Sequence, residues 1–351
     1  MRNIYKWPLW HWHIEISSKC TLECPRCPRA LVPNTLVQTE LDLNFFKNTF
    51  TPDLLKHEVQ KFTFCGDDGD PIYAKDFLNV IEYIKQNNKN IQIEIVTNGS
   101  YKTSIWWNKL AKTLNNNDLI HFSIDGFDQE SNEEYRINCN WKSMMVGLEI
   151  MCNNSEAFVQ WACIAFKFNE HKLDHMKQLA IDIGCDLWQL TLSTQFGSKY
   201  DHYNVNGYDK FEPNNKELIA GDHRYDRTIH SLTDRQYKRN YIKHNSNLYT
   251  GVKSIYNDSP HIPICLIGNK GMYINSKGKF FPCCWVAQRF DHQEPYWISP
   301  EFDLNNNTLE EVLNSDKWTE LFDSLITNKT FFECAIKCPS KVVDHNYATT
   351  W

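Results

Sequence analysis

The feature that most constrains this chain is a group of three cysteines near the N-terminus, Cys20, Cys24 and Cys27, spaced C-x3-C-x2-C. They follow residues 12–17, where apolar and polar residues alternate as in a half-buried strand. Three thiolates on one short loop can bind three irons of a 4Fe–4S cluster and leave the fourth iron open, whereas most such clusters take four cysteines. A structural zinc site needs four ligands, and no second cysteine pair lies nearby in the sequence. The spacing therefore favours an iron–sulfur cluster over zinc.

Length and composition set the broad class. With 351 residues, 42% of them hydrophobic, the chain can form one large domain and a smaller one, or two domains of ordinary size. No apolar stretch reaches the length of a membrane span, and the N-terminus lacks a signal peptide, so we expect a cytoplasmic protein with no membrane partner. In a reducing compartment, clustered cysteines indicate metal binding or catalysis rather than disulfides. The net charge of −6 argues against a nucleic-acid partner, for which residues 224–243 would be the obvious basic source.

Six short β-rich segments alternate with helical patterns up to about residue 193. The expected strands are residues 12–17, 61–65, 91–97, 119–125, 159–166 and 187–193. Such βα units predict a parallel sheet with right-handed crossovers. Six units are too few for a full eightfold barrel, so the expected fold class is α/β, a partial (β/α)6 TIM-like barrel. Its chemistry should gather at the C-terminal ends of the strands.

The second expected strand ends in a turn of sequence CGDDGDP, residues 65–71. Gly66 and Gly69 allow a sharp turn and a close approach to a ligand. Asp68 and Asp70 add carboxylates, and a carboxylate beside exposed carbonyls suits an ammonium group. A polar Asp/Gly turn is common by itself, so its meaning depends on the cysteine loop that precedes it.

Further polar residues follow the next three strands. Asn98 lies in a Thr-Asn-Gly sequence, Ser123 and Asp125 alternate along the fourth strand, Arg136 follows, and Asn169 comes after the fifth strand. Each also has a structural interpretation: a plain turn for Asn98, a loop-capping Asp125 with a surface arginine, and a helix N-cap for Asn169.

The three-cysteine loop after a first strand, with these strand-end motifs, resembles the radical S-adenosylmethionine (radical SAM) superfamily. The resemblance implies that the three cysteines hold a 4Fe–4S cluster and that SAM chelates its open iron. The Asp68–Pro71 turn would correspond to the Gly-Gly-Glu-Pro motif that holds the methionyl amine. It departs from that motif twice, because Asp68 replaces the first glycine and Asp70 replaces glutamate.

The same resemblance suggests roles for the other strand-end residues. Ser123 and Arg136, with Asp125, would engage the SAM carboxylate and ribose region, Asn98 would lie below the adenosine, and Asn169 would lie near the adenine. Cys65 abuts the SAM turn, where its thiol could donate a hydrogen atom to a substrate radical, although core packing is the simpler interpretation.

The last third of the chain is expected to form a separate unit. We expect a barrel over residues 1–197 and a polar linker over 198–260, which packs against the barrel rather than binding substrate and has a helical pattern at 230–243. Residues 261–351 should form a small α+β domain. It would contain a hairpin at 272–281 with its turn at 275–278, and a helix at 309–325.

A second cysteine group lies in this unit: Cys265, Cys283, Cys334 and Cys338, with Cys284 as a spare. The pattern resembles the SPASM or twitch extension of radical SAM enzymes. A full SPASM domain carries seven cysteines, so the resemblance implies one auxiliary 4Fe–4S cluster here. A zinc ribbon with four cysteine ligands is the alternative.

The function implied by the resemblance is reductive cleavage of SAM to a 5′-deoxyadenosyl radical, which abstracts a hydrogen atom from a substrate C–H bond. The net reaction would be oxidation, crosslinking or epimerisation, with electrons from a flavodoxin- or ferredoxin-type donor. We favour a peptide substrate. Because no leader-recognition domain precedes the expected barrel, a small sugar-like or nucleotide substrate is the alternative. A non-enzymatic iron–sulfur or zinc scaffold or sensor is the alternative from another class.

Overall fold

The computed structural model describes residues 9–27, 29, 36–193, 208–220, 227–237, 272–287 and 299–326, and the account below concerns these residues. They contain a sheet with the strand order β7-β6-β5-β4-β3-β2-β1-β8-β9. The strands are β1 His11–Ile14, β2 Lys61–Phe64, β3 Gln92–Thr97, β4 Leu119–Ser123, β5 Phe158–Ile164, β6 Leu187–Thr191, β7 Arg227–Ser231, β8 Met272–Ile274 and β9 Phe280–Phe281. Strands β1 to β6 are parallel to one another, as predicted, and follow the chain order from one edge to the other.

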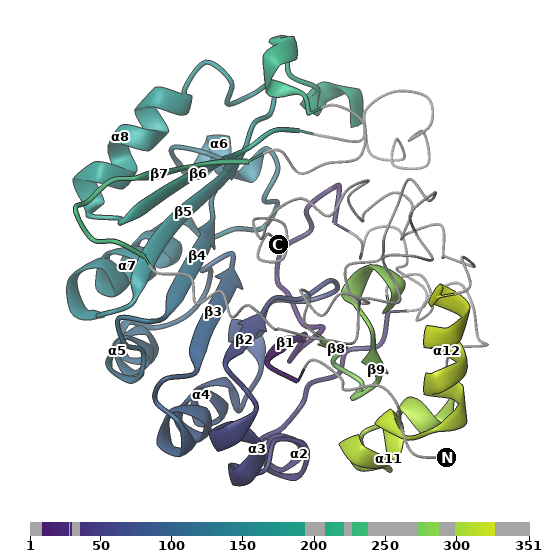
Figure 1. Ribbon diagram of the computed structural model, residues 1–351. Coiled ribbons are helices and arrows are strands. Elements are labelled where there is room, and N and C mark those ends of the chain that lie inside the picture. Colours follow the sequence, from purple (N-terminus) through teal and green to yellow (C-terminus); the bar gives the residue numbers. More distant parts are fainter. Residues whose placement is uncertain are drawn as a thin grey trace.

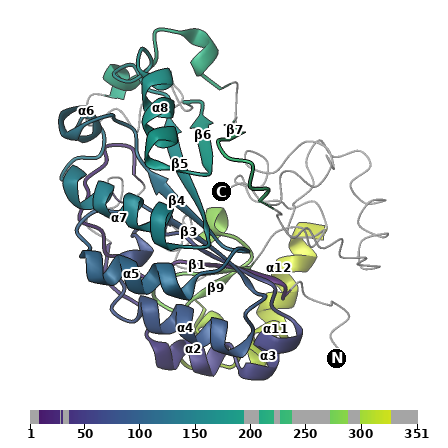
Figure 2. The same ribbon diagram turned by 90° about the vertical axis from the view of Figure 1, so that its left-hand side faces the viewer.

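Helices connect these strands and cover the outer face of the curved sheet, with α4, α5, α7 and α8 side by side along it (Figures 1 and 2). The α-helices are α2 Leu43–Thr49, α3 Pro52–His57, α4 Phe77–Asn87, α5 Ser104–Thr113, α6 Gln129–Glu133, α7 Trp141–Asn154, α8 Leu173–Ile183, α11 Leu309–Leu313 and α12 Asp316–Ile326. Short 3-10 helices lie at Pro71–Tyr73, Tyr208–Phe211, Lys216–Leu218 and Pro300–Phe302. No helix among these is long and apolar enough to cross a bilayer.

The helix ends follow from local sequence. Asp42, Thr51, Thr103 and Asn140 each accept a hydrogen bond from a backbone N–H in the first turn of the helix that they precede. Gly184 ends α8 with a left-handed conformation, φ +93°, which glycine adopts readily at a helix C-cap.

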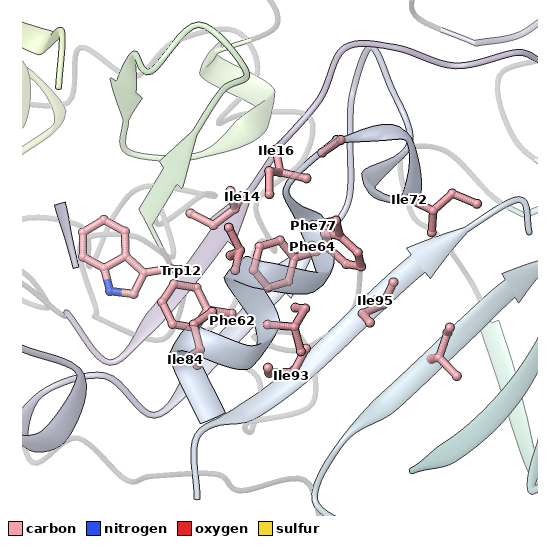
Figure 3. Close-up of a cluster of buried hydrophobic side chains, with 14 of the residues drawn as sticks. Trp12, Ile14, Ile16, Phe62, Phe64, Ile72, Phe77, Ile84, Ile93 and Ile95 are labelled. Carbon is pink, nitrogen blue, oxygen red and sulfur yellow. The ribbon is translucent and has the colours of Figure 1, made fainter. Parts of the chain in front are cut away.

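The two faces of the sheet differ sharply in polarity. On β1, Trp12 and Ile14 point toward the helices and are fully buried, and the equivalent positions of β2 and β3 carry phenylalanine and isoleucine (Figure 3). The alternate positions face the interior of the barrel and are mostly polar, for example His13 on β1, Thr63 on β2 and Glu94 on β3. The outer face therefore forms the hydrophobic core, and the inner face is left for polar chemistry.

Strands β7, β8 and β9 extend the sheet beyond the expected barrel. Strand β7 pairs antiparallel with β6. The helix expected at 230–243 is therefore wrong for its described part, because residues 227–231 are a strand and 232–237 are not helical. An edge strand forms through backbone hydrogen bonds, so its polar sequence gives little periodic signal.

The expected hairpin is confirmed: β8 and β9 are antiparallel, and Gly278 lies in the turn. Strand β8 also pairs in parallel with β1, which places the hairpin in the same sheet as the barrel. Phe280 stacks on Trp318 at 4.6 Å between ring centroids and lies 5.7 Å from the ring of Trp12. The described part of the C-terminal unit thus shares one hydrophobic core with the barrel. The expected helix at 309–325 is interrupted between α11 and α12 at residues 314–315.

Candidate active site

A cavity of about 390 Å³ lies at the C-terminal ends of the parallel strands. The cysteine loop, the turn after β2, and the ends of β3 to β6 contribute to its wall. Of the residues predicted for the site, it is lined by Cys20, Cys24, Cys27, Cys65, Gly66, Asp68, Gly69, Asp70, Asn98, Ser123 and Arg136. Residues from four separate parts of the sequence therefore meet where the fold predicts chemistry.

The three thiols of the N-terminal loop are buried or half-buried. The Cys27 backbone N–H donates to the Cys24 carbonyl at 3.0 Å, which closes the loop, and the Leu22 N–H donates to Cys20 Sγ at 3.4 Å. The pKa of Cys20 and of Cys27 is raised to about 12, mainly by burial; the Asp70 carboxylate adds to the increase at Cys20, and Cys24 adds to it at Cys27. Burial also raises the pKa of Cys24. Without a metal to bind, these groups are thiols rather than thiolates at neutral pH.

Within the described ranges, no three histidine, cysteine or acidic side chains converge on a point that would suit a single metal ion. A cubane has a different requirement, because each cysteine binds its own iron. Three thiols around one cavity, each able to lose its proton on binding iron, are a suitable donor set for such a cluster.

The turn after β2 packs directly against the strand that leads to the cysteine loop. A Cβ atom at Gly69 would overlap Ser17 O and the backbone of Ser18, so glycine is required there. The Asp70 backbone N–H donates to Lys19 O at 3.0 Å, next to the first cysteine of the loop. The Asp68 N–H donates to Glu15 Oε1 at 2.6 Å.

The Asp70 carboxylate is already engaged by the end of β3. It accepts hydrogen bonds from Thr97 Oγ1 at 2.8 Å and from both the backbone N and Nδ2 of Asn98 at 2.6 Å. Burial nevertheless raises the pKa of Asp70 to about 6. Asn98 Nδ2 lies 3.6 Å from Cys20 Sγ. Asn98 is therefore a link between the carboxylate and the cysteine loop as well as a strand-end turn.

Arg136 reaches the cavity from behind β4 with Asp125 as its partner. Its Nε donates to Asp125 Oδ2 at 2.6 Å, and its Nη1 lies 4.0 Å from Cys24 Sγ. Burial disfavours the charged guanidinium, but Asp125, together with Cys24 and Tyr135, outweighs burial, so the pKa of Arg136 is raised. Asp125 is fully buried and does not line the cavity, so it acts on the site through its neighbours: Oδ2 accepts from Arg136, and Oδ1 accepts from the Ile164 N–H at 2.7 Å.

Asn169 also stands back from the cavity. Its Nδ2 donates to Asp125 O at 2.8 Å and to Ile164 O at 2.9 Å, and its Oδ1 accepts from Phe166 N. Asn169 is not the N-cap of α8: that position is Lys172, whose side chain makes no capping hydrogen bond. Asn169 therefore joins the ends of β4 and β5 and holds Asp125 in place.

Several lining residues were not expected from the sequence. They are His121 on β4, Cys163 on β5, Gln189 and Thr191 on β6, Arg227 on β7, and Trp285 after the hairpin, together with Arg26 and Arg29. For the strand residues the signal was present, since His121 and Ser123 share one face of β4 two positions apart. Cys163 was expected to be a buried small hydrophobe, and it packs in the core while also reaching the cavity.

The C-terminal hairpin meets the site along β1. The Ser276 N–H donates to Glu15 Oε2 at 3.4 Å, and the ring of Tyr273 lies 4.9 Å from that of His13. His13 in turn contacts Cys65 O at 2.8 Å. Burial raises the pKa of Cys65, so its thiol holds its proton firmly.

Of the second cysteine group, Cys283 and Cys284 follow β9 and are free thiols, half-buried and buried respectively. The other three predicted ligands, Cys265, Cys334 and Cys338, lie outside the described residues.

Residues 265–339 match the family model of SPASM, described as an iron–sulfur cluster-binding domain. Solved structures share the overall fold. SuiB of Streptococcus suis bound to S-adenosylmethionine has a TM-score of 0.54 and 15% identity, covering 93% of this chain and 68% of that chain. The chain has the radical SAM fold with a SPASM domain.

Two other solved structures agree. SuiB bound to the precursor peptide SuiA has a TM-score of 0.56 and 14% identity over 92% of this chain and 68% of that chain. Native anSMEcpe with bound AdoMet has a TM-score of 0.51 and 14% identity over 97% of this chain and 94% of that chain. No curated protein matches the sequence. The expected partial barrel and SPASM-type extension are therefore confirmed.

Proposed function

We propose that this protein is a radical SAM enzyme that abstracts a hydrogen atom from a substrate C–H bond. The observation that carries the proposal is the meeting of the three cysteines with the Asp70 turn and Arg136 around one cavity of the radical SAM fold. Cys20, Cys24 and Cys27 would hold the 4Fe–4S cluster, and SAM would occupy the adjoining part of the cavity. When bound, the cluster supplies the electron that cleaves SAM and so starts the radical chemistry.

The residues of this chain would orient and shield the reactants. Asp125 fixes Arg136 so that its remaining N–H groups can donate to a carboxylate such as that of SAM. The oxygens of Asp70 accept hydrogen bonds from β3, so its role would be to shape the turn whose backbone groups meet the methionyl amine. Ser123 lies on the cavity wall as a hydroxyl donor. The apolar outer face of the sheet and its helices exclude water from the far side.

The auxiliary cluster would be held by Cys265, Cys283, Cys334 and Cys338 in the SPASM domain. An iron–sulfur domain beside the cavity can accept an electron from a substrate radical, which favours net oxidation or crosslinking, with a flavodoxin or ferredoxin as the external electron donor. If the net reaction is epimerisation, Cys65 is the candidate donor of the second hydrogen atom, because it lines the cavity.

We propose a peptide as the substrate. One solved structure of the same fold carries a precursor peptide, although at only 14% identity. A small polar substrate is the second candidate, favoured by the polar inner face of the barrel.

Anaerobic reconstitution tests the proposed function. We expect about eight irons per chain, from two four-iron clusters, and formation of 5′-deoxyadenosine that depends on a reductant. Replacing Cys20, Cys24 and Cys27 together by alanine should leave about four irons and abolish SAM cleavage. Cys152→Ala, on the α7 helix away from the cavity, is the matched control and should change neither. Zinc content without SAM cleavage would establish the scaffold or sensor instead.

A further inference from the structure

A continuous series of buried polar side chains crosses the inner face of the barrel from β2 to β6. It begins with an ion pair of 2.5 Å between Lys61 Nζ and Glu94 Oε2. The other oxygen of Glu94 lies 2.8 Å from His121 Nε2, and His121 Nδ1 lies 2.8 Å from Gln160 Nε2. Each of these residues is at most 5% exposed, so water cannot substitute for a misplaced partner.

The series ends at the cavity. Gln160 Nε2 also donates to Gln189 Oε1 at 2.9 Å, and Gln189 Nε2 donates to Thr191 Oγ1 at 3.1 Å. Gln189 and Thr191 line the cavity, whereas Gln160 lies beneath it. The series therefore connects a buried ion pair to the β6 wall of the candidate active site.

The chemistry of the side chains determines which atom donates and which accepts in each hydrogen bond of this series. A carboxylate only accepts, so the His121 nitrogen facing Glu94 carries the proton. With that proton on Nε2, His121 Nδ1 is the nitrogen that faces Gln160 and accepts there. Gln160 must then present its amide nitrogen to His121.

The same nitrogen of Gln160 serves Gln189, whose oxygen must accept and whose nitrogen must donate to Thr191. The Thr191 oxygen is thereby used as an acceptor. Its own proton is available to an acceptor in the cavity, since the described residues show no bond donated by this hydroxyl.

The neighbouring strand adds donors to the same wall. Arg227 on β7 is the register partner of Thr191, and it lines the cavity too. A guanidinium has five N–H donors and no acceptor, in a geometry that matches a carboxylate. The acidic side chains of the cavity, Asp67, Asp68 and Asp70, lie instead on the turn after β2.

We propose that the β6–β7 wall binds a carboxylate of the substrate, with Thr191 and Arg227 as its contacts. His121, Gln160 and Gln189 are positioning residues in this proposal, because the series that they form orients the Thr191 hydroxyl. The inference rests on the proposed function and narrows its substrate to an acid. The carboxylate belongs either to a peptide, as an acidic side chain or C-terminus, or to a small acid.

The test measures equilibrium binding to the reconstituted full chain, with SAM present, by calorimetry. The probes are two peptide libraries that differ only in Asp and Glu against Asn and Gln, and the small molecules succinate and succinamide. We expect the acidic member of one pair to bind at least about ten times more tightly, as a hydrogen bond to a charged group allows. Tighter binding of the acidic peptide library than of the amide library identifies the ligand as a peptide carboxylate. Tighter binding of succinate than of succinamide identifies it as a small acid. Equal binding of charged and neutral probes, or binding of none of them, overturns the proposal.

Substitutions at Thr191 and Arg227 test whether these two side chains contact the carboxylate of the probe. Thr191→Val should abolish the preference for the acidic probe, and Thr191→Ser, which keeps the hydroxyl, should restore it. Arg227→Met should weaken only the acidic probe. An unchanged preference in Thr191→Val or in Arg227→Met overturns the proposal.

The positioning role of Gln160 is tested by the ratio of the affinities for the acidic and the amide probes. Gln160→Glu removes both donated hydrogen bonds at nearly constant size, and should lower the acid-to-amide preference while leaving affinity for the amide probe unchanged. Gln86→Glu, an exposed position on α4, is the control. An unchanged preference in Gln160→Glu would overturn that role. Formation of 5′-deoxyadenosine in the same samples reports the proposed radical chemistry separately, so a wild-type protein that cleaves SAM but shows no preference for the acidic probe refutes only the carboxylate site.

Discussion

Arg136 Nε lies 2.6 Å from Asp125 Oδ2, and this ion pair connects a fully buried carboxylate to the wall of the cavity. The guanidinium reaches the cavity from one side and is held by Asp125 from the other. A fixed cation beside the cysteine loop costs no reorganisation when an anionic ligand group arrives.

Asp125→Asn should therefore lower both the stability of the protein and its SAM cleavage. Removing one partner leaves a buried, unpaired guanidinium, and we expect the free energy of unfolding to fall by about 3 kcal/mol or more in denaturant titrations. SAM cleavage should fall with it, because Arg136 loses its orientation. The exposed Glu212–Lys216 pair, 2.8 Å apart, is the comparison: Glu212→Gln should cost less than about 0.5 kcal/mol. Equal effects of the two substitutions would contradict the assignment of Asp125 as the support of Arg136.

Asp70 should make the cluster-free protein less stable as the pH rises. Burial raises the pKa of Asp70 from 3.8 to about 6, so the folded chain keeps this proton to higher pH than the unfolded chain does. Its contribution to stability is complete below about pH 4 and is lost as the pH rises through about 6. Between pH 4 and 7 the wild type should lose roughly 3 kcal/mol relative to Asp70→Asn, measured by unfolding at each pH.

Asp128 provides a comparison for the direction in which Asp70 changes stability with pH. Hydrogen bonds from Ser131 lower the pKa of Asp128, so its stabilising contribution is present at neutral pH and is lost on acidification. Asp128→Asn should therefore alter the pH dependence in the direction opposite to Asp70→Asn. The same direction for both would refute the burial argument.

Gly69→Ala should prevent the turn after β2 from packing on the strand before the cysteine loop. The new Cβ would overlap backbone atoms of Ser17 and Ser18, which cannot rotate away, and we expect a loss of about 3 kcal/mol or more. Gly184→Ala meets no close neighbour and bears only the strain of a positive φ, so it should cost about 1 kcal/mol. Thermal unfolding of the two variants makes the comparison, and similar midpoints would show that the turn can move.

Glu15→Gln should loosen the contact between the hairpin and the turn after β2. One carboxylate accepts from Asp68 N at 2.6 Å and from Ser276 N at 3.4 Å, and an amide offers only one oxygen for the two. We expect hydrogen exchange at one or both amides to become about ten times faster. Glu310→Gln, exposed on α11, should leave both rates unchanged, and protection that persists in Glu15→Gln would exclude the bridging role.

The barrel could be predicted because its signals are local. Alternation along β1 and β2, a C-cap glycine at Gly184 and the turn around Gly278 each depend on a few adjacent residues. Except for β3, the barrel strands end about one to three residues earlier than expected. After β1, for example, Ser17 forms an isolated bridge with Glu40 on another loop. Strand β7 was missed since its pairing partner on β6 lies about forty positions earlier in the sequence.

The candidate site was predictable in part for the same reason. Motifs directly after strands placed Cys20, Asp70 and Arg136 near one another, since parallel strands end at one edge. That Asp125 and Asn169 support the wall instead of lining it depends on side-chain direction, which spacing does not reveal. Arg227 and Trp285 come from distant segments that only the folded chain brings to the cavity.

The pairing of Trp12 with Met272 has a consequence for the order in which the protein is made. Strand β1 leaves the ribosome first, but the partner for its second edge is synthesised only after the whole barrel. Until then the nascent sheet has an open edge at β1, able to pair with another chain. A fragment that stops before β8 should therefore aggregate rather than form a free-standing barrel, because β8 covers the open edge of the strand that leads to Cys20.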